Sequence, residues 1–246
     1  MSDVMVGIQL YTVREDLKKD FKGTLKALAA MGYSGVEFAG NYGDMSPKEL
    51  AAFLHSLGLH AIGLHTSFDE ILNPKSQSYT IARGLNASFL TTSPAGEVSK
   101  DWKAAVDRMA QAAATAYSQG FIFTCHNHAQ ELTLFDGVSA LDMAMSRISL
   151  IQFELDTYWL TKGGQDPVSY IRKYAGRAPQ IHLKDMDATD GSWAEVGKGT
   201  IDMKAVLAAA TAGAARWLIV EQDACKRPPL ESAKISIEAV RSLAGL

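Results

Sequence analysis

The strongest constraint on the fold is the regular alternation of apolar segments and amphipathic segments along the 246 residues. Short apolar runs rich in Val, Ile and Phe predict buried strands, and the helical spacing of Leu and Ala residues between them predicts helices. Eight strand–helix units follow one another at roughly 30-residue intervals, the size of one such unit. Alternation of this kind produces a parallel sheet, and eight is the number of strands that closes a barrel; a doubly wound open sheet is the alternative. We therefore predict an α/β fold, a single-domain (β/α)8 TIM barrel over residues 1–246.

The expected elements can be placed along the chain. The expected strands are 4–12 and then SGVEFAG, LHAIGLHTS, ASFLTTS, FIFTCHNH, LIQFELD, QIHLKD and WLIVEQ. The expected helices cover 20–31, 46–58, 74–85, 99–119, 139–147, 166–174, 202–212 and 229–243. Ser46 followed by Pro47 is typical of a helix start. No Pro/Gly/Ser-rich linker or change in composition divides the chain, so we expect one domain.

Composition and charge exclude several classes of protein. Hydrophobic residues make up 47% and charged residues 21%, which is typical of a globular chain with a sizeable core. A formal net charge of -3 gives no general attraction to phosphate backbones, so we expect no nucleic-acid partner. An uninterrupted apolar stretch of about 18 residues does not occur, so we expect no membrane partner. The start of the chain lacks a secretory pattern, and we expect a cytoplasmic protein.

Ionisable and metal-binding side chains gather in the stretch FIFTCHNHAQE, residues 121–131. An apolar strand passes directly into His126 and His128, and Glu131 follows. Because side chains alternate along a strand, the two histidines share one face. Three later strands also end in polar residues: Asp156 in IQFELDTYW, His182 in PQIHLKD and Glu221 in WLIVEQD. Since the active sites of parallel barrels lie where the strands end, this pattern predicts an enzyme.

The polar strand ends suit a metal ion. Three carboxylates and one imidazole form a donor set for a divalent metal, Mn, Zn, Co or Mg, and they belong to Glu131, Asp156, His182 and Glu221. A charge that closes an apolar strand needs a partner. A salt bridge or a helix cap is the alternative for each residue taken singly, and His182 could be a satisfied core histidine. His126 is the alternative ligand to Glu131, which lies a few residues beyond its strand.

Other residues near the strand ends are candidates for catalysis or substrate binding. Glu131, Glu221 and His126 are candidate bases, although His126 and His128 could equally be ligands or groups that orient Glu131. Lys184 shares the strand face of His182 and could neutralise an oxyanion. The expected substrate contacts are Glu37, His65, His128, Trp159 and Glu195. Glu195 lies in the loop WAEVGKGTID, whose glycines match neither a dinucleotide-binding nor a P-loop pattern, so we expect no nucleotide cofactor.

Seven segments carry a resemblance to a known family. They are, in order, GIQLYTVR, GYSGVEFAG, CHNHAQEL, FELDTYW, IHLKDM, EVGKGTID and IVEQD. Together they resemble the xylose isomerase-like TIM-barrel superfamily, and within it the sugar phosphate isomerase/epimerase branch. The resemblance implies a metal held by a Glu after the fifth strand, an Asp ending the sixth, a His in the seventh and a Glu ending the eighth. These positions are Glu131, Asp156, His182 and Glu221.

The sequence departs from one group of this superfamily at two positions. Related ketose epimerases have a His three residues after the sixth-strand Asp and a Glu on the fifth strand. This chain has Trp159 and His126 at those positions. Both differences make it look more like members that act on inositol derivatives or on 3-keto sugars and glycosides.

These observations lead to an expected function. We expect a metal-dependent isomerase or epimerase of carbohydrate metabolism that acts on a sugar, sugar phosphate, keto sugar or inosose through proton abstraction and a metal-held enediolate. A related lyase or dehydratase, or an enzyme that cleaves 3-keto glycosides, is the first alternative. An abasic-site endonuclease and a non-catalytic sugar-binding barrel are further alternatives. A small sugar or polyol is the expected partner, and a homodimer is left open.

Overall fold

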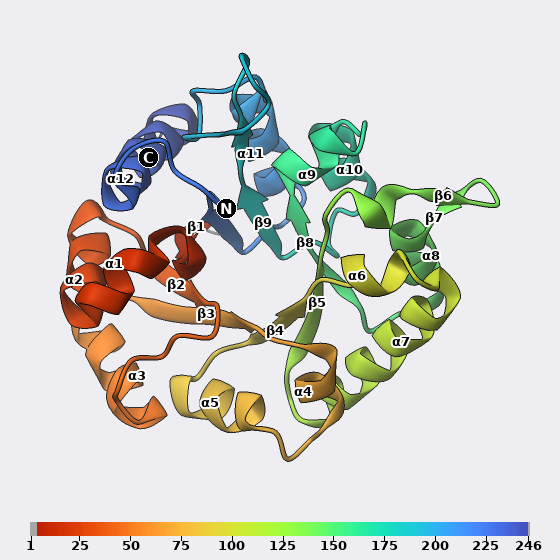
Figure 1. Ribbon diagram of the computed structural model, residues 1–246, viewed down its shortest axis with the longest axis horizontal. Coiled ribbons are helices and arrows are strands. Elements are labelled where there is room, and N and C mark those ends of the chain that lie inside the picture. The colour runs from red at the N-terminus through yellow and green to blue at the C-terminus, as the bar shows by residue number, and fades with distance from the viewer. Residues whose placement is uncertain (1–3, 246) are drawn as a thin grey trace.

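Eight parallel strands form the centre of the molecule. The structure, a computed structural model, describes residues 4–245. Its strands close into a barrel in the order β1-β12-β9-β8-β5-β4-β3-β2, which confirms the predicted (β/α)8 fold (Figure 1). The barrel strands are β1 Met5–Gln9, β2 Gly35–Phe38, β3 His60–His65, β4 Phe89–Thr92, β5 Ile122–His126, β8 Gln152–Asp156, β9 Gln180–Leu183 and β12 Trp217–Val220.

The major helices surround the barrel, as Figure 1 shows. They are α2 Phe21–Met31, α3 Pro47–Ser56, α5 Gln77–Leu85, α7 Trp102–Ser118, α8 Ala140–Arg147, α10 Pro167–Lys173, α11 Met203–Ala212 and α12 Pro229–Ala244. Local signals fix their ends: Ser46 and Glu49 form a capping box at α3, and Gly32, with φ 95°, ends α2. No helix among residues 4–245 is long and apolar enough to cross a membrane.

Additional short elements follow several of the barrel strands, and the sequence did not predict them. The helical ones are η1 Leu10–Val13, α1 Arg14–Lys19, α4 Phe68–Leu72, α6 Ala95–Val98, η2 Gln130–Leu132 and α9 Thr157–Lys162. Two small sheets pair β6 Leu134–Phe135 with β7 Val138–Ser139 and β10 Asp185–Met186 with β11 Trp193–Ala194. Segments this short cannot display a helical period. The strand expected over 4–12 ends at Gln9, because its side chain accepts a hydrogen bond from Tyr11 N and begins η1.

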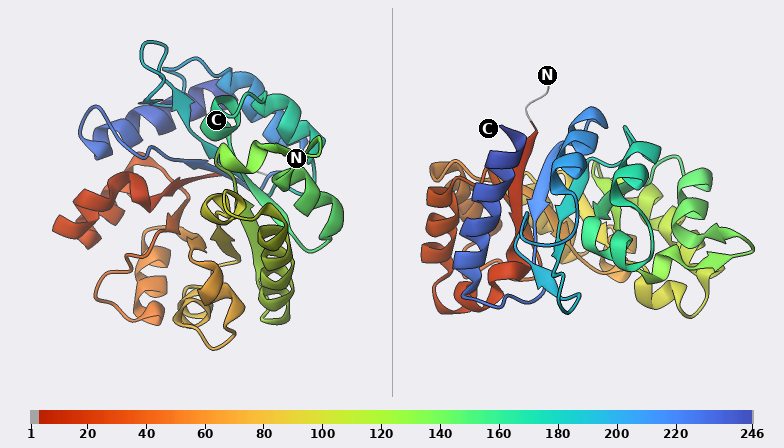
Figure 2. Two further views of the ribbon diagram at one scale, coloured as in Figure 1. Left: turned by 45° about the vertical axis from the view of Figure 1, so that its right-hand side comes forward. Right: turned by 90° about the horizontal axis from the view of Figure 1, so that it is seen from above.

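Side chains that point into the barrel form layers. At the end where the strands begin, Ile62, Phe89, Trp217 and Ile219 make an apolar cluster separate from the main core, which lies between strands and helices. A Cβ atom on Gly35 would lie 2.8 Å from the Trp217 ring, so glycine makes room for this indole. Further along the same strands the inward residues become polar. The long connections after β9 and β12 lie together at the end where the strands finish (Figure 2).

Candidate active site

Four side chains converge where β5, β8, β9 and β12 end. They are His126, Asp156, His182 and Glu221, here termed the mouth cluster, and their ligand atoms all lie within 4.8 Å of one another. His126 Nε2 lies 3.3 Å from Asp156 Oδ2, and His182 Nδ1 lies 2.7 Å from Glu221 Oε2. All four residues are buried. Thus the alternative ligand His126 lies with three of the expected metal ligands.

The donor chemistry of the mouth cluster fits a divalent cation. His182 Nδ1 and Glu221 Oε2 are buried, and neither has a well-aligned hydrogen-bond partner among residues 4–245. Glu221 Oε2 keeps its ion pair with Lys184 at 2.9 Å, and a divalent cation would give His182 Nδ1 and Glu221 Oε2 an aligned partner. Two imidazoles and two carboxylates are ligands that zinc, manganese and cobalt accept.

Lys184 lies among the carboxylates of the mouth. Its Nζ atom is 3.2 Å from Asp156 Oδ2, 2.9 Å from Glu221 Oε2 and 3.0 Å from Asp223 Oδ1. Burial lowers the pKa of Lys184, but the three carboxylates outweigh this effect and raise the pKa above its usual value. Burial likewise raises the pKa of Glu221, and Lys184 and His182 outweigh it and hold that pKa well below its usual range. Glu221 is therefore ionised, as a metal ligand must be.

A second set of polar side chains lies one layer deeper in the barrel. We term Glu37, His65, Glu154 and Gln180 the floor cluster. His65 Nε2 lies 2.6 Å from Glu154 Oε1 and 3.2 Å from Glu37 Oε2. Gln180 Nε2 donates to both carboxylates, at 2.7 and 2.8 Å. Burial lowers the pKa of His65, but Glu154 and Glu37 outweigh it and raise the pKa to about 10, so His65 is a cation between two carboxylates.

His182 joins the two clusters. Its Nε2 atom lies 2.8 Å from Glu37 Oε2 and 3.1 Å from Glu154 Oε1 in the floor, while its Nδ1 atom faces Glu221 in the mouth. A carboxylate that binds one nitrogen of a histidine fixes the ring so that the other nitrogen can serve as a ligand. The floor cluster thus orients His182 toward the mouth.

Glu131 lies in η2, and its carboxylate has other partners. It accepts hydrogen bonds from Ser93 Oγ at 3.0 Å and from the backbone N–H of His128 at 3.0 Å. Burial raises the pKa of Glu131 to about 7. Ser93 Oγ is also 2.8 Å from His128 Nδ1, so Ser93 connects the carboxylate to an imidazole whose ring lies 5.0 Å from that of His126. The metal-binding and catalytic roles of Glu131 stay predictions.

A cavity of about 340 Å³ opens at the mouth cluster. Its lining residues are Gln9, Tyr11, Ala39, His65, Ser93, His126, His128, Lys184, Glu221 and Asp223. This volume is at the small end of the range for ligand sites, which suits a molecule of about monosaccharide size. The cavity therefore brings an organic ligand and the candidate metal ligands together.

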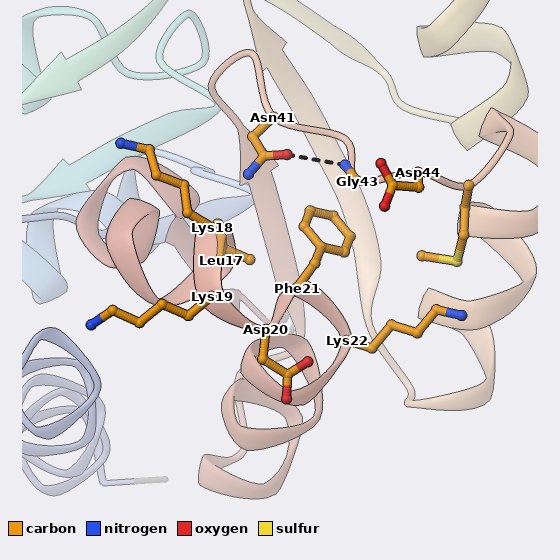
Figure 3. A pocket seen from close by; sticks show the side chains of 10 residues that line it. Leu17, Lys18, Lys19, Asp20, Phe21, Lys22, Asn41, Gly43 and Asp44 are labelled. Atoms are coloured by element: carbon orange, nitrogen blue, oxygen red, sulfur yellow. Dashed lines mark hydrogen bonds between the residues drawn. The ribbon is translucent and has the colours of Figure 1, made fainter.

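A larger depression of about 640 Å³ lies elsewhere, between the start of α2 and the segment that precedes α3 (Figure 3). Figure 3 shows Phe21 between Asn41 and Lys22, with Lys18 and Lys19 extended to one side. Its polar groups serve local structure, since Asp20 caps α2 and Lys18 pairs with Glu15. These contacts give the depression no arrangement of groups comparable to the mouth cluster.

The structure places the remaining expected substrate contacts at different depths. His65 and His128 line the cavity, whereas Glu37 is fully buried in the floor. Trp159 lies in α9 with its ring 4.8 Å from that of His128. Glu195 accepts hydrogen bonds from Arg227 and Ser232, which hold it near α12. Substrate contact by these residues stays a prediction.

Several residues of the site were not singled out from the sequence. Glu154 and Gln180 each stand two residues before an expected ligand, so strand alternation alone would have placed them on the same inward face. Ser93 directly follows β4, and Asp223 lies in the loop after β12, where no period indicates direction. Only the meeting of loops in the folded chain brings these two residues to the cavity.

Comparison with known proteins agrees with this architecture. The family model described as xylose isomerase-like TIM barrel matches residues 25–243. An inosose dehydratase of Clostridium beijerinckii is 22% identical, over 94% of this chain and 92% of its own. A solved sugar phosphate isomerase/epimerase from Parabacteroides distasonis has a TM-score of 0.79 at 22% identity, covering 98% of this chain and 94% of its own. The IOLI protein, solved with a bound zinc atom, has a TM-score of 0.80 at 15% identity and 98% coverage of both chains.

The two structural similarities establish the fold, and the names of the relatives are those of enzymes that act on sugar-like molecules. The family match extends over most of the sequence and includes every strand from β2 onward. This chain therefore belongs to the xylose isomerase-like TIM barrel family.

Proposed function

We propose that the protein is a divalent-metal-dependent enzyme that moves a proton at the carbon next to a carbonyl group, and so isomerises or epimerises a small sugar, keto sugar or inosose. The observation that carries this proposal is the convergence of His126, Asp156, His182 and Glu221 within 4.8 Å at a cavity of sugar size. Such a reaction needs a positive charge beside the reacting oxygen and a base beside the reacting carbon.

The positive charges belong to the mouth. His126, Asp156, His182 and Glu221 would hold a divalent ion, which when bound supplies positive charge to stabilise the oxygen that becomes negative as the proton leaves. Lys184 adds an ammonium group that lines the same cavity. Because it is 1% exposed and surrounded by carboxylates, this group is already positioned before a substrate arrives.

His128 is the group best placed to take the proton. Burial and Lys184 lower the pKa of His128, so the imidazole is neutral and able to accept a proton. Ser93 has a single hydroxyl proton, which an ionised Glu131 attracts. Ser93 Oγ then accepts from His128 Nδ1–H, and the lone pair of the ring remains on Nε2. The hydrogen-bonded series Glu131–Ser93–His128 therefore prepares a base that lines the cavity.

Metal analysis combined with proton exchange tests this proposal. Purified protein should contain about one divalent ion per chain, and ketoses or inososes incubated with it in deuterium oxide should gain solvent deuterium. The Asp156→Ala variant should lose both the ion and the exchange. Asp156 also caps α9, so Asp166→Ala, which removes an equivalent cap from α10, is the matched control. Retention of metal and full exchange by Asp156→Ala would rule out the proposed site.

Dehydration is the second candidate reaction, because an inosose dehydratase matches 94% of the chain. Both reactions begin with removal of a proton beside a carbonyl group, and they differ in whether a hydroxyl group then leaves. A product that is lighter by one water molecule in mass spectrometry would identify the lyase. Deuterium uptake at unchanged composition would identify the isomerase or epimerase.

A further inference from the structure

Sugar substrates occur both free and phosphorylated, and the positive groups around the cavity distinguish between the two. Lys184 is the lysine that lines the cavity, and its Nζ atom is already within 3.2 Å of three carboxylates. Arg14 lies nearby, but its guanidinium donates to the carbonyl oxygens of Tyr11 at 2.7 Å and Asp223 at 3.0 Å. It also stacks on the Tyr11 ring at 4.0 Å. Both cations are therefore engaged by the protein itself, as is the His65 cation, which lines the cavity and lies between Glu154 and Glu37.

The glycine-containing loop after β9 has the backbone N–H groups that could bind a phosphate. These groups already have an anionic partner in the chain. Asp185 Oδ2 accepts from Gly197 N at 2.9 Å and from Gly199 N at 3.0 Å, and Asp185 Oδ1 accepts from Ile201 N at 3.1 Å. The carboxylate of Asp185 thus occupies the place that a phosphate group would take in this loop.

The cations of the loop after β12 are also paired with carboxylates of the chain. In many (β/α)8 enzymes the connections after the seventh and eighth strands bind the phosphate of the substrate. Here Lys226 pairs with Asp187 at 2.8 Å and Asp190 at 3.0 Å, and Arg227 pairs with Glu195 at 3.0 Å. The residues after β12 that line the cavity are Glu221 and Asp223, both carboxylates. Carboxylates therefore stand at the cavity wall, and the two cations of the loop are held by other residues.

From these contacts we infer that the cavity selects uncharged polyhydroxy substrates and rejects phosphorylated ones, and that Asp223 is the residue that enforces this choice. The inference rests on the proposed function, because it names the substrate class of that same cavity. A phosphate group entering the cavity would meet the carboxylates of Asp223 and Glu221. Tyr11, 41% exposed at the cavity, instead offers an aromatic face suited to the C–H groups of a sugar ring.

The test is a calorimetric titration of the metal-loaded protein with inorganic phosphate at low ionic strength. The wild type should show no saturable binding. The Asp223→Asn variant keeps the shape of the side chain and removes its charge, and it should bind phosphate saturably, about tenfold or more tighter than the weakest binding that the wild-type titration could have detected. Asp136→Asn removes an equal charge from the β6–β7 hairpin, which projects from the outside of the barrel (Figure 1), and should leave the wild-type result unchanged.

Each outcome bears on the inference. Saturable phosphate binding by the wild type would overturn it, as would an Asp223→Asn variant that binds no more phosphate than the wild type. A gain confined to Asp223→Asn would support it. The titration needs no turnover, so it can be separated from the proposed function, which fails if metal and deuterium exchange are absent. A parallel assay measures deuterium uptake by D-fructose and by D-fructose 6-phosphate. D-Fructose 6-phosphate should take up no deuterium, and a preference for it over D-fructose would also overturn the inference.

Discussion

The floor cluster and the mouth cluster both combine carboxylates with imidazoles, and His182 of the mouth contacts the floor, yet their atoms are satisfied in different ways. In the floor, Gln180 bonds to both carboxylates and His65 lies between them. In the mouth, His182 Nδ1 and Glu221 Oε2 remain without an aligned partner among the described residues. The carboxylate oxygens of Glu37 and Glu154 all have partners, although Gln180 Oε1 has none among the described residues. Paired carboxylates give rigidity, whereas the facing atoms of the mouth are prepared for a ligand. The comparison therefore assigns support to the floor and binding to the mouth.

The largest effect should follow from breaking the mouth itself. Glu221→Ala removes a charged donor from the proposed metal site, and Lys184 still has Asp156 and Asp223 as partners. We expect metal affinity to fall by more than the roughly 100-fold that marks the loss of an outer partner, with loss of deuterium exchange. Metal titration of the folded variant measures this. Glu238→Ala, on the exposed side of α12, is the control and should bind metal normally.

Breaking the floor should have a smaller and different effect. Glu154→Gln keeps the size of the side chain but weakens the acceptor that faces His182 Nε2. We expect a loss of roughly 10–100-fold in metal affinity, because the ligand is still present but less firmly oriented. The visible spectrum of the cobalt-loaded protein should shift, which a purely structural effect on stability would not cause. Wild-type affinity and spectrum in this variant would contradict the supporting role of the floor.

Burial raises the pKa of the Glu131 carboxyl to about 7. Only the ionised form attracts the Ser93 proton, so kcat/KM should rise with pH to a plateau above about 7. Glu131→Gln should abolish this rise, with a loss smaller than the roughly 10²–10⁴-fold contribution of a complete general base. A pH profile of Glu131→Gln that matches the wild type would remove Glu131 from the proton path.

The same pKa has a consequence for stability. An unfolded glutamate releases its proton near pH 4.5, whereas folded Glu131 keeps its proton until about 7. The folded state binds more protons between these values, so the contribution of this group to the free energy of unfolding should decrease as pH rises through that window. Thermal melts of wild type and Glu131→Gln, compared from pH 4.5 to 8, measure the difference.

The smallest effect should come from the edge of the floor. Gln9 Nε2 donates to Glu37 Oε2 at 2.9 Å, and Glu37 keeps Gln180 and His182 as further partners. We expect Gln9→Leu to lower the free energy of unfolding by about 1 kcal/mol and to leave metal affinity unchanged. Chemical denaturation and metal titration measure the two quantities. A large loss of metal affinity here would mean that the floor behaves as part of the binding site.

The sequence predicted the fold well because its signals are local and repeated. Each barrel strand is an apolar run long enough to recognise, and the polar residues near the ends of β8 and β9 indicated Asp156 and His182, which lie in the mouth cluster. The roles of Glu37 and Glu154 were harder to predict, because a charge inside an apolar strand does not indicate which side chain it meets across the barrel. The partners of Glu131 depend on Ser93, from a different strand–helix unit, and no local pattern could reveal that contact.

The apolar cluster around Trp217 has a consequence for the order of binding. An apolar cluster fills the end of the barrel where the strands begin; its residues are Ile62, Phe89, Trp217 and Ile219. An ion and an organic molecule would therefore both have to enter from the opposite end. The ion, held by the mouth cluster, would bind first. A substrate that binds later would lie above the ion and block its exit. A chelator such as EDTA should accordingly remove the ion more slowly when a substrate is bound in the cavity.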